Sequence, residues 1–380
     1  MKRKYSAAAC VLLLFALLLT GAGLWNARGR GPLLQYVVIA PQGEGEIARL
    51  VRQKDDALED LSDAISASAV TAIETNAFVS APDAGTSAQA TLRAGGEGFF
   101  EVFPRYLVSG RLLSETELEK GEKKAVLDED LAFKLFPTIN PVGAKITVGG
   151  SELEIVGVVR HQRRVGETDL YSVYAPVLAL LDAEYEIIAL SALPVEGSGA
   201  AIMFEDSAEA LWQGGGFFCD FEKEALRAQL PLLYTMVIFG FAAAIWLLRR
   251  VNSLAMQAVG SIKRRMEDEY AARLAPRMIL YAAGLIAAYA AVFGLMWLIG
   301  TQAVRPLYTF PEWVPENIVE WSAIRDVFWN LAVQGAKMTN AASGEMRALQ
   351  FWAGTVRWGV LFGLVGMLLV LVSAKEKSEE

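Results

Sequence analysis

Four uninterrupted apolar stretches constrain this chain more than any other feature. Each has roughly the 20 residues that an α-helix needs to cross the hydrocarbon core of a bilayer. None contains Asp, Glu or Lys, and their only charged residue is Arg357. In lipid every backbone polar group must find a partner within the segment, which favours a helix. The sequence therefore predicts four membrane-spanning helices, over 7–25, 230–248, 278–299 and 355–372.

The first stretch has a second interpretation. It could be a secretory signal that is cleaved after Ala22. Its apolar run continues to Trp25, beyond the length of a usual signal core, so we favour an uncleaved anchor.

Basic residues cluster at three places beside the predicted spans. They precede the first span at 2–4, lie between the second and third spans, and follow the fourth at Lys375 and Lys377. Lys and Arg are enriched in cytoplasmic loops, so both termini are predicted to lie in the cytoplasm. The formal net charge is −8, and the acidic remainder then lies outside the cytoplasmic membrane. An acidic outer surface argues against nucleic-acid binding.

The expected fold class is an α+β extracytoplasmic domain attached to a four-helix transmembrane α domain. Within the outer domain, residues 125–127 are predicted to form a strand and residues 128–136 a short helix. Gly149-Gly150 is predicted to form the turn of a β-hairpin. A helix is predicted over 44–67, a strand over 69–79 and a turn-rich loop over 80–88. The divisions are a cytoplasmic N-terminus with the first span (1–26), the outer domain (27–229), the second span (230–248), a cytoplasmic coupling loop (249–277), the third span (278–299), an extracytoplasmic segment (300–354), the fourth span (355–373) and a cytoplasmic tail (374–380).

The sequence offers little catalytic chemistry. Its one histidine, His161, lies in a basic turn and is predicted to be an exposed loop residue. Cys10 and Cys219 are expected to be unpaired. The chain has no HExxH, no Cys/His cluster, no G-x-S-x-G and no Walker A sequence. We therefore expect no enzyme activity, no catalytic residue, no metal and no cofactor.

Several motifs of the outer domain resemble those of one known family. Residues 98–104 (GFFEVFP) and 107–111 (LVSGR) are followed by matching runs at 125–127, 140–146 and 155–159. Their order and spacing resemble the MacB-like periplasmic core, and the pattern of spans resembles the MacB/FtsX-type ABC transporter permeases. The family-motif core in this chain comprises Gly110, Arg111, Pro141, Gly143 and Gly157.

The cytoplasmic segment is also similar to that family. Residues 254–260 (LAMQAVG) resemble the permease segment that precedes a characteristic glycine, although Ser253 stands where the family usually has Glu. The helical spacing of its apolar residues predicts an amphipathic helix, which would contact a partner or lie on the anionic inner leaflet. The residues expected to contact an ATPase partner are Val251, Leu254, Ala255, Ala258, Val259, Gly260 and Ile262.

The resemblance implies a subunit that is driven by another protein. It implies a separate ABC ATPase and a homo- or heterodimer of permease subunits in the membrane lipid. The outer domain would change conformation to export or extract a peptide, lipoprotein or antibiotic. Two alternatives remain: a transmission subunit that activates a cell-wall hydrolase or another outer protein, and an ATPase-independent scaffold.

Two further patterns concern helix packing. Gly359, Gly363 and Gly366 repeat at a spacing that lets helix backbones approach closely, within this chain or between two copies. The outer segment 300–354 is longer than in the family and rich in Trp, which is common at membrane boundaries. Trp329, Val333 and Ala336 are predicted to share a helix face along the bilayer surface.

Overall fold

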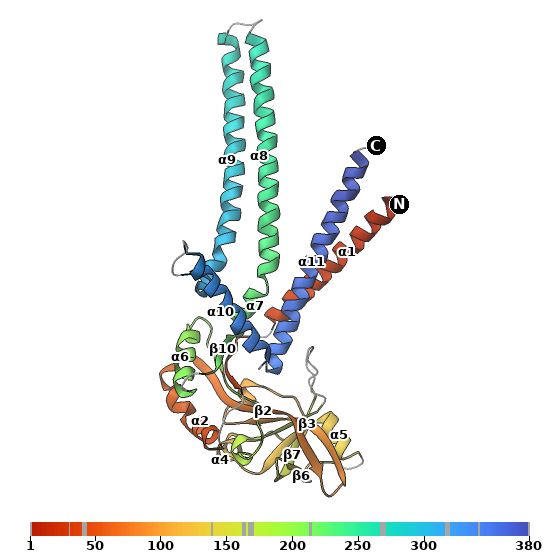
Figure 1. The fold of residues 1–380 in the computed structure, drawn as a ribbon, viewed down its shortest axis with the longest axis vertical. Coiled ribbons are helices and arrows are strands. Elements are labelled where there is room, and N and C mark those ends of the chain that lie inside the picture. The colour runs from red at the N-terminus through yellow and green to blue at the C-terminus, as the bar shows by residue number, and fades with distance from the viewer. Residues whose placement is uncertain are drawn as a thin grey trace. The chain divides into compact units, whose positions relative to one another are not determined.

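The computed structural model describes residues 2–29, 31–39, 44–137, 140–161, 165, 171–212, 215–266, 271–315, 320–340 and 343–378. The chain forms two compact units (Figure 1). The sheet unit comprises Trp25–Ala225 and Asn330–Trp352. The helix unit comprises Met1–Leu24, Leu226–Trp329 and Ala353–Glu380.

The sheet unit is built on one ten-stranded mixed sheet. The strand order is β10-β1-β9-β2-β3-β8-β5-β7-β4, and β6 pairs with β2 and β7. Two pairs are parallel, β3 with β8 and β5 with β7. The strands are β1 (Leu34–Ile39), β2 (Ile65–Ala81), β3 (Thr86–Gly95), β4 (Leu107–Gly110), β5 (Lys124–Asp128), β6 (Lys145–Val148), β7 (Ser151–Val159), β8 (Ser172–Pro176), β9 (Ile187–Pro194) and β10 (Phe217–Asp220).

Helices cover both faces of this sheet. On β2, Val70 and Ala72 belong to one buried cluster, whereas Ala69 and Ile73 belong to the other, because successive side chains of a strand point to opposite faces. The first cluster takes side chains from α2 (Glu44–Ala57), α5 (Glu129–Leu135) and α6 (Ala200–Trp212). The second takes them from α3 (Phe99–Val102), α4 (Glu115–Lys120), α7 (Phe221–Arg227) and the start of α11 (Gly344–Ser378).

The predicted strand, helix and hairpin within 125–159 are confirmed. Asp128 ends β5 and caps α5, since its carboxylate accepts a hydrogen bond of 2.6 Å from the backbone N–H of Leu131. Strands β6 and β7 meet with Val148 opposite Ser151. Gly149 and Gly150 between them both have positive φ, as a two-residue hairpin turn of this kind requires.

Two other predictions for this unit are wrong. The helix predicted over 44–67 ends at Ala57, and after a 3₁₀ turn at Glu59–Leu61 the chain enters β2 at Ile65. The loop predicted over 80–88 is mostly strand, because β2 and β3 pair as far as Ala81 with Thr86. In both places pairing with neighbouring strands overrides the weak local preference of Ala- and Ser-rich sequence.

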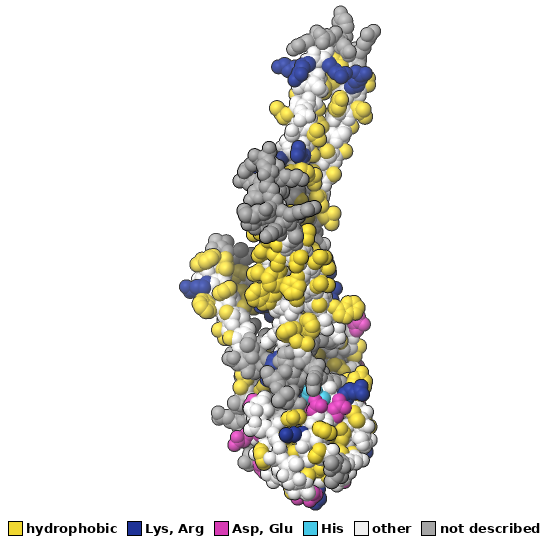
Figure 2. All heavy atoms as spheres, turned by 90° about the vertical axis from the view of Figure 1, so that its right-hand side faces the viewer, with side chains coloured by type: hydrophobic (Ala, Val, Ile, Leu, Met, Phe, Trp, Pro, Cys, Tyr) yellow, Lys and Arg dark blue, Asp and Glu magenta, His cyan; other side chains and the backbone are white. Residues whose placement is uncertain are grey.

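Four helices of the chain are long and apolar enough to cross a membrane, and they contain the four predicted spans. They are α1 (Lys2–Arg28), α8 (Leu230–Met266), α9 (Ala271–Thr309) and α11. Hydrophobic side chains lie over the surface of these helices, and Lys and Arg gather at the end of the α8–α9 pair (Figure 2). The segment between α9 and α11 adds a 3₁₀ turn (Pro311–Trp313) and α10 (Trp321–Asn340).

The cytoplasmic loop predicted over 249–277 is largely helical. Helix α8 continues to Met266 and α9 begins at Ala271, so the segment predicted as a separate amphipathic helix is part of α8. The two helices lie side by side, and the hydroxyl of Tyr289 donates a hydrogen bond to the side-chain oxygen of Asn252. Packing between α8 and α9 is the physical reason for the amphipathic pattern.

The glycines of α11 lie against α1 of the same chain. A Cβ atom at Gly359 would lie 2.8 Å from the backbone nitrogen of Thr20, and one at Gly366 would lie 3.0 Å from the side chain of Leu13. At Gly363 the nearest atom would be the Cβ of Ala16, at an ordinary 3.6 Å. The stripe therefore permits close packing within one chain.

We predict that Gly359→Ala loosens this helix pair and Gly363→Ala does not. The first methyl group would force the α1 and α11 backbones apart, at a cost of about 2 kcal/mol, as is typical of overpacking. Thermal unfolding of the full chain in detergent, followed by tryptophan fluorescence, measures the effect. Equal midpoints for the two variants would contradict this account of the packing.

Candidate functional site

Two of the four membrane helices join the sheet at neighbouring strands. Helix α1 ends at Arg28, shortly before β1 begins at Leu34. Strand β10 leads directly into α7, which is followed by α8. Because β1 pairs with β10 along Leu34 to Val37, the chain enters and leaves the sheet at one place.

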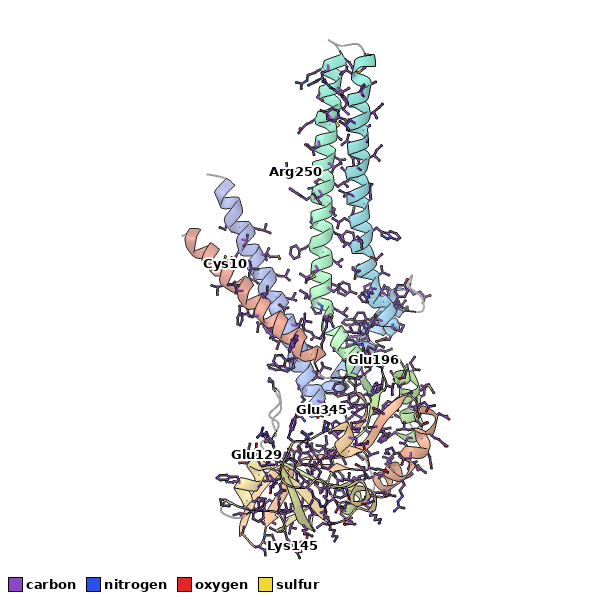
Figure 3. The ribbon with its side chains drawn as sticks, turned by 180° about the vertical axis from the view of Figure 1, so that it is seen from behind. Cys10, Glu129, Lys145, Glu196, Arg250 and Glu345 are labelled. Carbon is purple, nitrogen blue, oxygen red and sulfur yellow. The ribbon has the colours of Figure 1, made fainter. Side chains whose placement is uncertain are left out.

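The first turn of α11 is attached to the same strand by a chain of buried polar groups. The Ser343 hydroxyl donates to the side-chain oxygen of Gln35 at 2.9 Å, and the Gln35 amide donates to the Ser191 hydroxyl on β9 at 3.1 Å. All three side chains are at most 2% exposed. Glu345 marks this turn beside the sheet in Figure 3. We call Gln35, Ser191 and Ser343 the junction triad.

The junction triad lies within an apolar environment. Met346 and Leu349 of α11 belong to the same buried cluster as Val37 of β1 and Phe217 of β10. In such surroundings a hydrogen bond is strong, and a group left without its partner is costly. Three of the four membrane helices are therefore tied, by chain connection or by buried contact, to β1 and β10.

We predict that Ser343→Ala releases the start of α11 from β1. The change leaves the buried Gln35 oxygen without this donor, at a cost of about 1–3 kcal/mol. Amide hydrogen exchange should then become faster over residues 343–349 of the full chain. Ser198→Ala, which removes an exposed hydroxyl bonded to Ala64, is the control. Unchanged exchange in the Ser343 variant would show that the triad does not hold the helix.

A groove of about 830 Å³ lies beside the junction, within the sheet unit. Its walls include aromatic side chains and two groups able to carry charge, Arg105 and Glu345. The Arg105 guanidinium also lies 5.1 Å from the centre of the Tyr174 ring. The aromatic residues that line the groove are Trp25, Phe103, Tyr106 and Phe221.

The motif glycines allow two strands to approach closely. Gly110 on β4 pairs with Gly157 on β7. A Cβ at Gly157 would overlap the carbonyl oxygen of Arg111, and one at Gly110 would overlap that of Val156. Gly143 lies in the turn before β6 and has a positive φ. Its backbone N–H donates a hydrogen bond to the carbonyl of Ile155 on β7, which positions the start of β6. Pro141 lies in the same turn, and its carbonyl accepts from Ala144.

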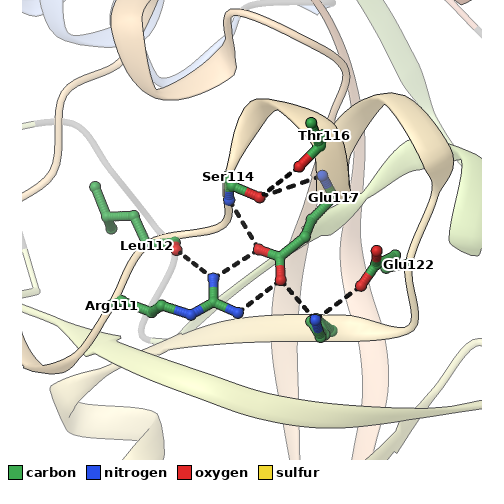
Figure 4. Close-up of polar contacts among 7 residues, drawn as sticks. Arg111, Leu112, Ser114, Thr116, Glu117 and Glu122 are labelled. Atoms are coloured by element: carbon green, nitrogen blue, oxygen red, sulfur yellow. Dashed lines mark hydrogen bonds and ion pairs between the residues drawn. The ribbon is translucent and has the colours of Figure 1, made fainter.

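Arg111 belongs to a charged cluster that joins β4, α4 and β5. Its guanidinium makes two hydrogen bonds of 2.6 Å to Glu117, and the Lys124 ammonium lies 2.6 Å from the same carboxylate (Figure 4). Glu117 also completes a capping box with Ser114 at the start of α4. These hydrogen bonds, above all those from Arg111, hold the pKa of the Glu117 carboxyl well below its usual range. Sequence reasoning missed Glu117, although the S-x-x-E spacing from Ser114 could have revealed it.

We predict that Glu117→Gln destabilises the sheet unit near neutral pH, by about 2 kcal/mol for the lost charged hydrogen bonds. Because the folded pKa of Glu117 is depressed, its contribution is present above the unfolded pKa, about 4.3, and is lost as pH falls through the folded value. The difference in unfolding midpoint between wild type and variant should therefore shrink from pH 7 to pH 3. Glu122→Gln, at the exposed end of the cluster, should have little effect. A pH-independent difference would contradict this role.

His161 is not the exposed residue that the sequence predicts. Its side chain is 10% exposed, and its Nδ1 lies 3.2 Å from a carboxylate oxygen of Asp128. Asp128 also accepts from the backbone N–H of Ser172, so one carboxylate joins the ends of β5 and β7 to the start of β8. Burial raises the pKa of this carboxyl. The prediction failed because the carboxylate partner is 33 positions away in the sequence.

The described residues contain no group of three or more side chains suited to hold a metal ion. Cys10 lies on α1 in the helix unit and is labelled in Figure 3, whereas Cys219 is buried on β10 in the sheet unit. The two cysteines do not form a disulfide with each other, as predicted.

The predicted ATPase-contact residues are divided by the packing of α8. Val251, Ala255, Ala258 and Ile262 recur at helical spacing and are half-buried in the α8–α9 pair, and Gly260 is also half-buried. Leu254 and Val259 lie at opposite edges of this stripe and are each 59% exposed. Contact with an ATPase stays a prediction, and the side chains most available for it are these two.

Comparison with known proteins gives one family for most of this fold. The profile of the family described as "MacB-like periplasmic core domain" matches residues 8–208, more than half of the chain. The "Macrolide export ATP-binding/permease protein MacB" of Aggregatibacter actinomycetemcomitans is 33% identical over 87 residues, which are 22% of this chain and 14% of that protein. The "Uncharacterized ABC transporter permease YknZ" of Bacillus subtilis (strain 168) is 25% identical over 87 residues, 23% of this chain and 22% of that one. The similarity thus spans less than a quarter of each of these relatives.

Two solved structures resemble the chain at low sequence identity. The extracellular domain of the noncanonic ABC-type transporter YknZ from Gram-positive bacteria aligns with a TM-score of 0.38 and 15% identity, over 49% of this chain and 98% of that domain. The periplasmic region of MacB from Actinobacillus actinomycetemcomitans aligns with a TM-score of 0.39 and 18% identity, over 52% of this chain and 91% of that region.

Proposed function

This chain belongs to the MacB/FtsX-type ABC transporter permeases with a MacB-like periplasmic core domain, and from that membership we propose that it couples ATP hydrolysis by a separate ATPase to a conformational change of its sheet unit. It is a multi-pass membrane protein. The basic residues beside its spans favour both termini in the cytoplasm and the sheet unit outside a bacterial cytoplasmic membrane.

The observation that carries this proposal is the junction of the membrane helices with the sheet. Helices α1 and α8 connect to the paired strands β1 and β10, and α11 is held on β1 by the junction triad. A displacement of these helices would reach the sheet through the chain connections and through the first turn of α11, which belongs to the sheet unit. Such an arrangement suits a subunit that transmits movement and performs no reaction itself.

The energy for this movement would come from a partner. The sequence contains no Walker A motif, and a separate ATPase subunit is the proposed source of P-loop ATP hydrolysis. The contact would involve the end of α8, where Leu254 and Val259 are exposed and where Lys263, Arg264 and Arg265 give a basic surface. An ATP-bound partner drives this chain only if it binds one of its conformations more tightly than the other. A dimer of permease subunits would face a pair of ATPase subunits.

We predict that Leu254→Asp weakens binding of the ATPase about tenfold and lowers the stimulation of its activity. Burying a charge in place of an apolar contact costs more than 1.4 kcal/mol, which corresponds to that factor. The measurement is co-purification of the full chain with a candidate ABC ATPase from the same organism, followed by ATPase assay in vesicles. Met256→Asp is the matched control, because Met256 is also exposed but lies on the far side of α8 from Leu254. Equal binding by the two variants would count against this contact.

The groove in the sheet unit supports one proposed function above the others, namely export or extraction of an amphipathic peptide, lipoprotein or antibiotic. Its aromatic walls and its two charged groups suit a ligand with apolar and polar parts. Activation of a cell-wall hydrolase or another outer protein remains the alternative, and so does an ATPase-independent scaffold. Capture of envelope proteins by the full chain in the presence and absence of the ATPase separates these functions.

A further inference from the structure

Helix α10 exposes large apolar side chains that the proposed coupling function does not use. Trp321 is 77% exposed and Phe328 is 66% exposed. Ile324, Trp329 and Val333 on the same helix are exposed as well. We call these five residues the apolar strip of α10.

The apolar strip follows the geometry of one helix face. Trp321, Ile324 and Phe328 are spaced by three and four residues and therefore lie one above another. Trp329 and Val333 widen the strip along one edge. The exposed residues Asp326 and Asn330 lie beyond that edge, and Ala323 and Val327 form a half-buried side. The helix thus has distinct packed, apolar and polar sides.

The position of α10 in the chain indicates what covers the strip. Helix α10 stands between α9, which ends at Thr309, and α11, which begins at Gly344, and both of those helices are membrane-spanning candidates. Tyr308, at the end of α9, is 84% exposed, as expected of an aromatic residue at the boundary between lipid and water. Residues 310–320 join α10 to α9 and residues 341–343 join it to α11, so each end of α10 is linked by the chain to a membrane-spanning candidate.

The residue types also fit an interface between lipid and water. Trp prefers this depth because its ring is apolar and its N–H is polar. Arg325 lies within the apolar strip, and its long stem can lie along lipid while its charged end reaches water. A helix with these features typically lies in the plane of the membrane surface.

We propose that α10 is a membrane-interface helix whose apolar strip inserts into the bilayer leaflet next to the junction. The inference does not depend on ATPase coupling, and only the choice of leaflet depends on the proposed orientation.

The test places single spin labels along α10 in the full chain. Cys10 and Cys219 are first replaced by Ala, and one cysteine is introduced at Phe328, Ile324, Asp326 or Asn330. The labelled protein is reconstituted in vesicles of phosphatidylethanolamine and phosphatidylglycerol. Collision rates are then measured with oxygen, which concentrates in lipid, and with a water-soluble nickel chelate. Thermal unfolding confirms that each variant is folded.

The proposal predicts a ratio of oxygen to nickel collisions above one at Phe328 and Ile324 and below one at Asp326 and Asn330. A ratio below one at all four positions would overturn it, since the strip would face water. Low collision rates with both reagents at Phe328 would also overturn it, because a protein would then cover the strip. In that case dipolar broadening that disappears on dilution with unlabelled protein would identify a second copy of this chain.

Discussion

The side chain of Gln35 is the buried polar group on which the attachment of the first turn of α11 to the sheet depends. A buried amide must have partners at both its oxygen and its nitrogen, and Gln35 finds them in Ser343 and Ser191. Its strand follows α1 and pairs with the strand that leads to α8. The hydrogen bonds of the Gln35 amide therefore hold the start of α11 against β1. Helix α1 connects to this strand, and α8 connects to its neighbour β10.

The spans and the hairpin at Gly149-Gly150 could be predicted because they depend on local sequence. A run of apolar residues or a pair of glycines has few structural solutions. The junction triad could not be predicted, since Gln35 and Ser343 are 308 positions apart and neither belongs to a recognisable motif. Long-range contacts between ordinary polar residues leave no pattern in a single sequence.

The apolar pattern of 251–262 shows a different limit. Periodicity established that one face of this helix is covered, but it did not reveal what covers it. Partner contact and a lipid surface were both plausible, and α9 covers most of the face instead. Leu254 and Val259 remain exposed and are therefore available for contacts with other molecules. A covered helix face therefore has to be assigned to neighbours within the chain before it is assigned to partners.

The family motifs turn out to describe how the sheet is built. Gly110 and Gly157 are required because the backbones of β4 and β7 approach too closely for a Cβ, and Arg111 holds Glu117 beside them. These requirements are the same whatever the domain acts on, which is why the motifs reveal the fold without revealing a substrate.

The contacts of the membrane helices differ in strength, and this bears on where movement can occur. The junction triad is buried, so separating it costs about 1–3 kcal/mol for each group left without a partner. In the helix unit, Arg227 contacts Glu312 at 3.1 Å and lies 5.2 Å from the Phe310 ring, but this ion pair is about a third exposed. Exposed ion pairs contribute only about 0–1 kcal/mol. Local opening at the Arg227 ion pair, within the helix unit, therefore costs less than opening at the junction triad, within the sheet unit.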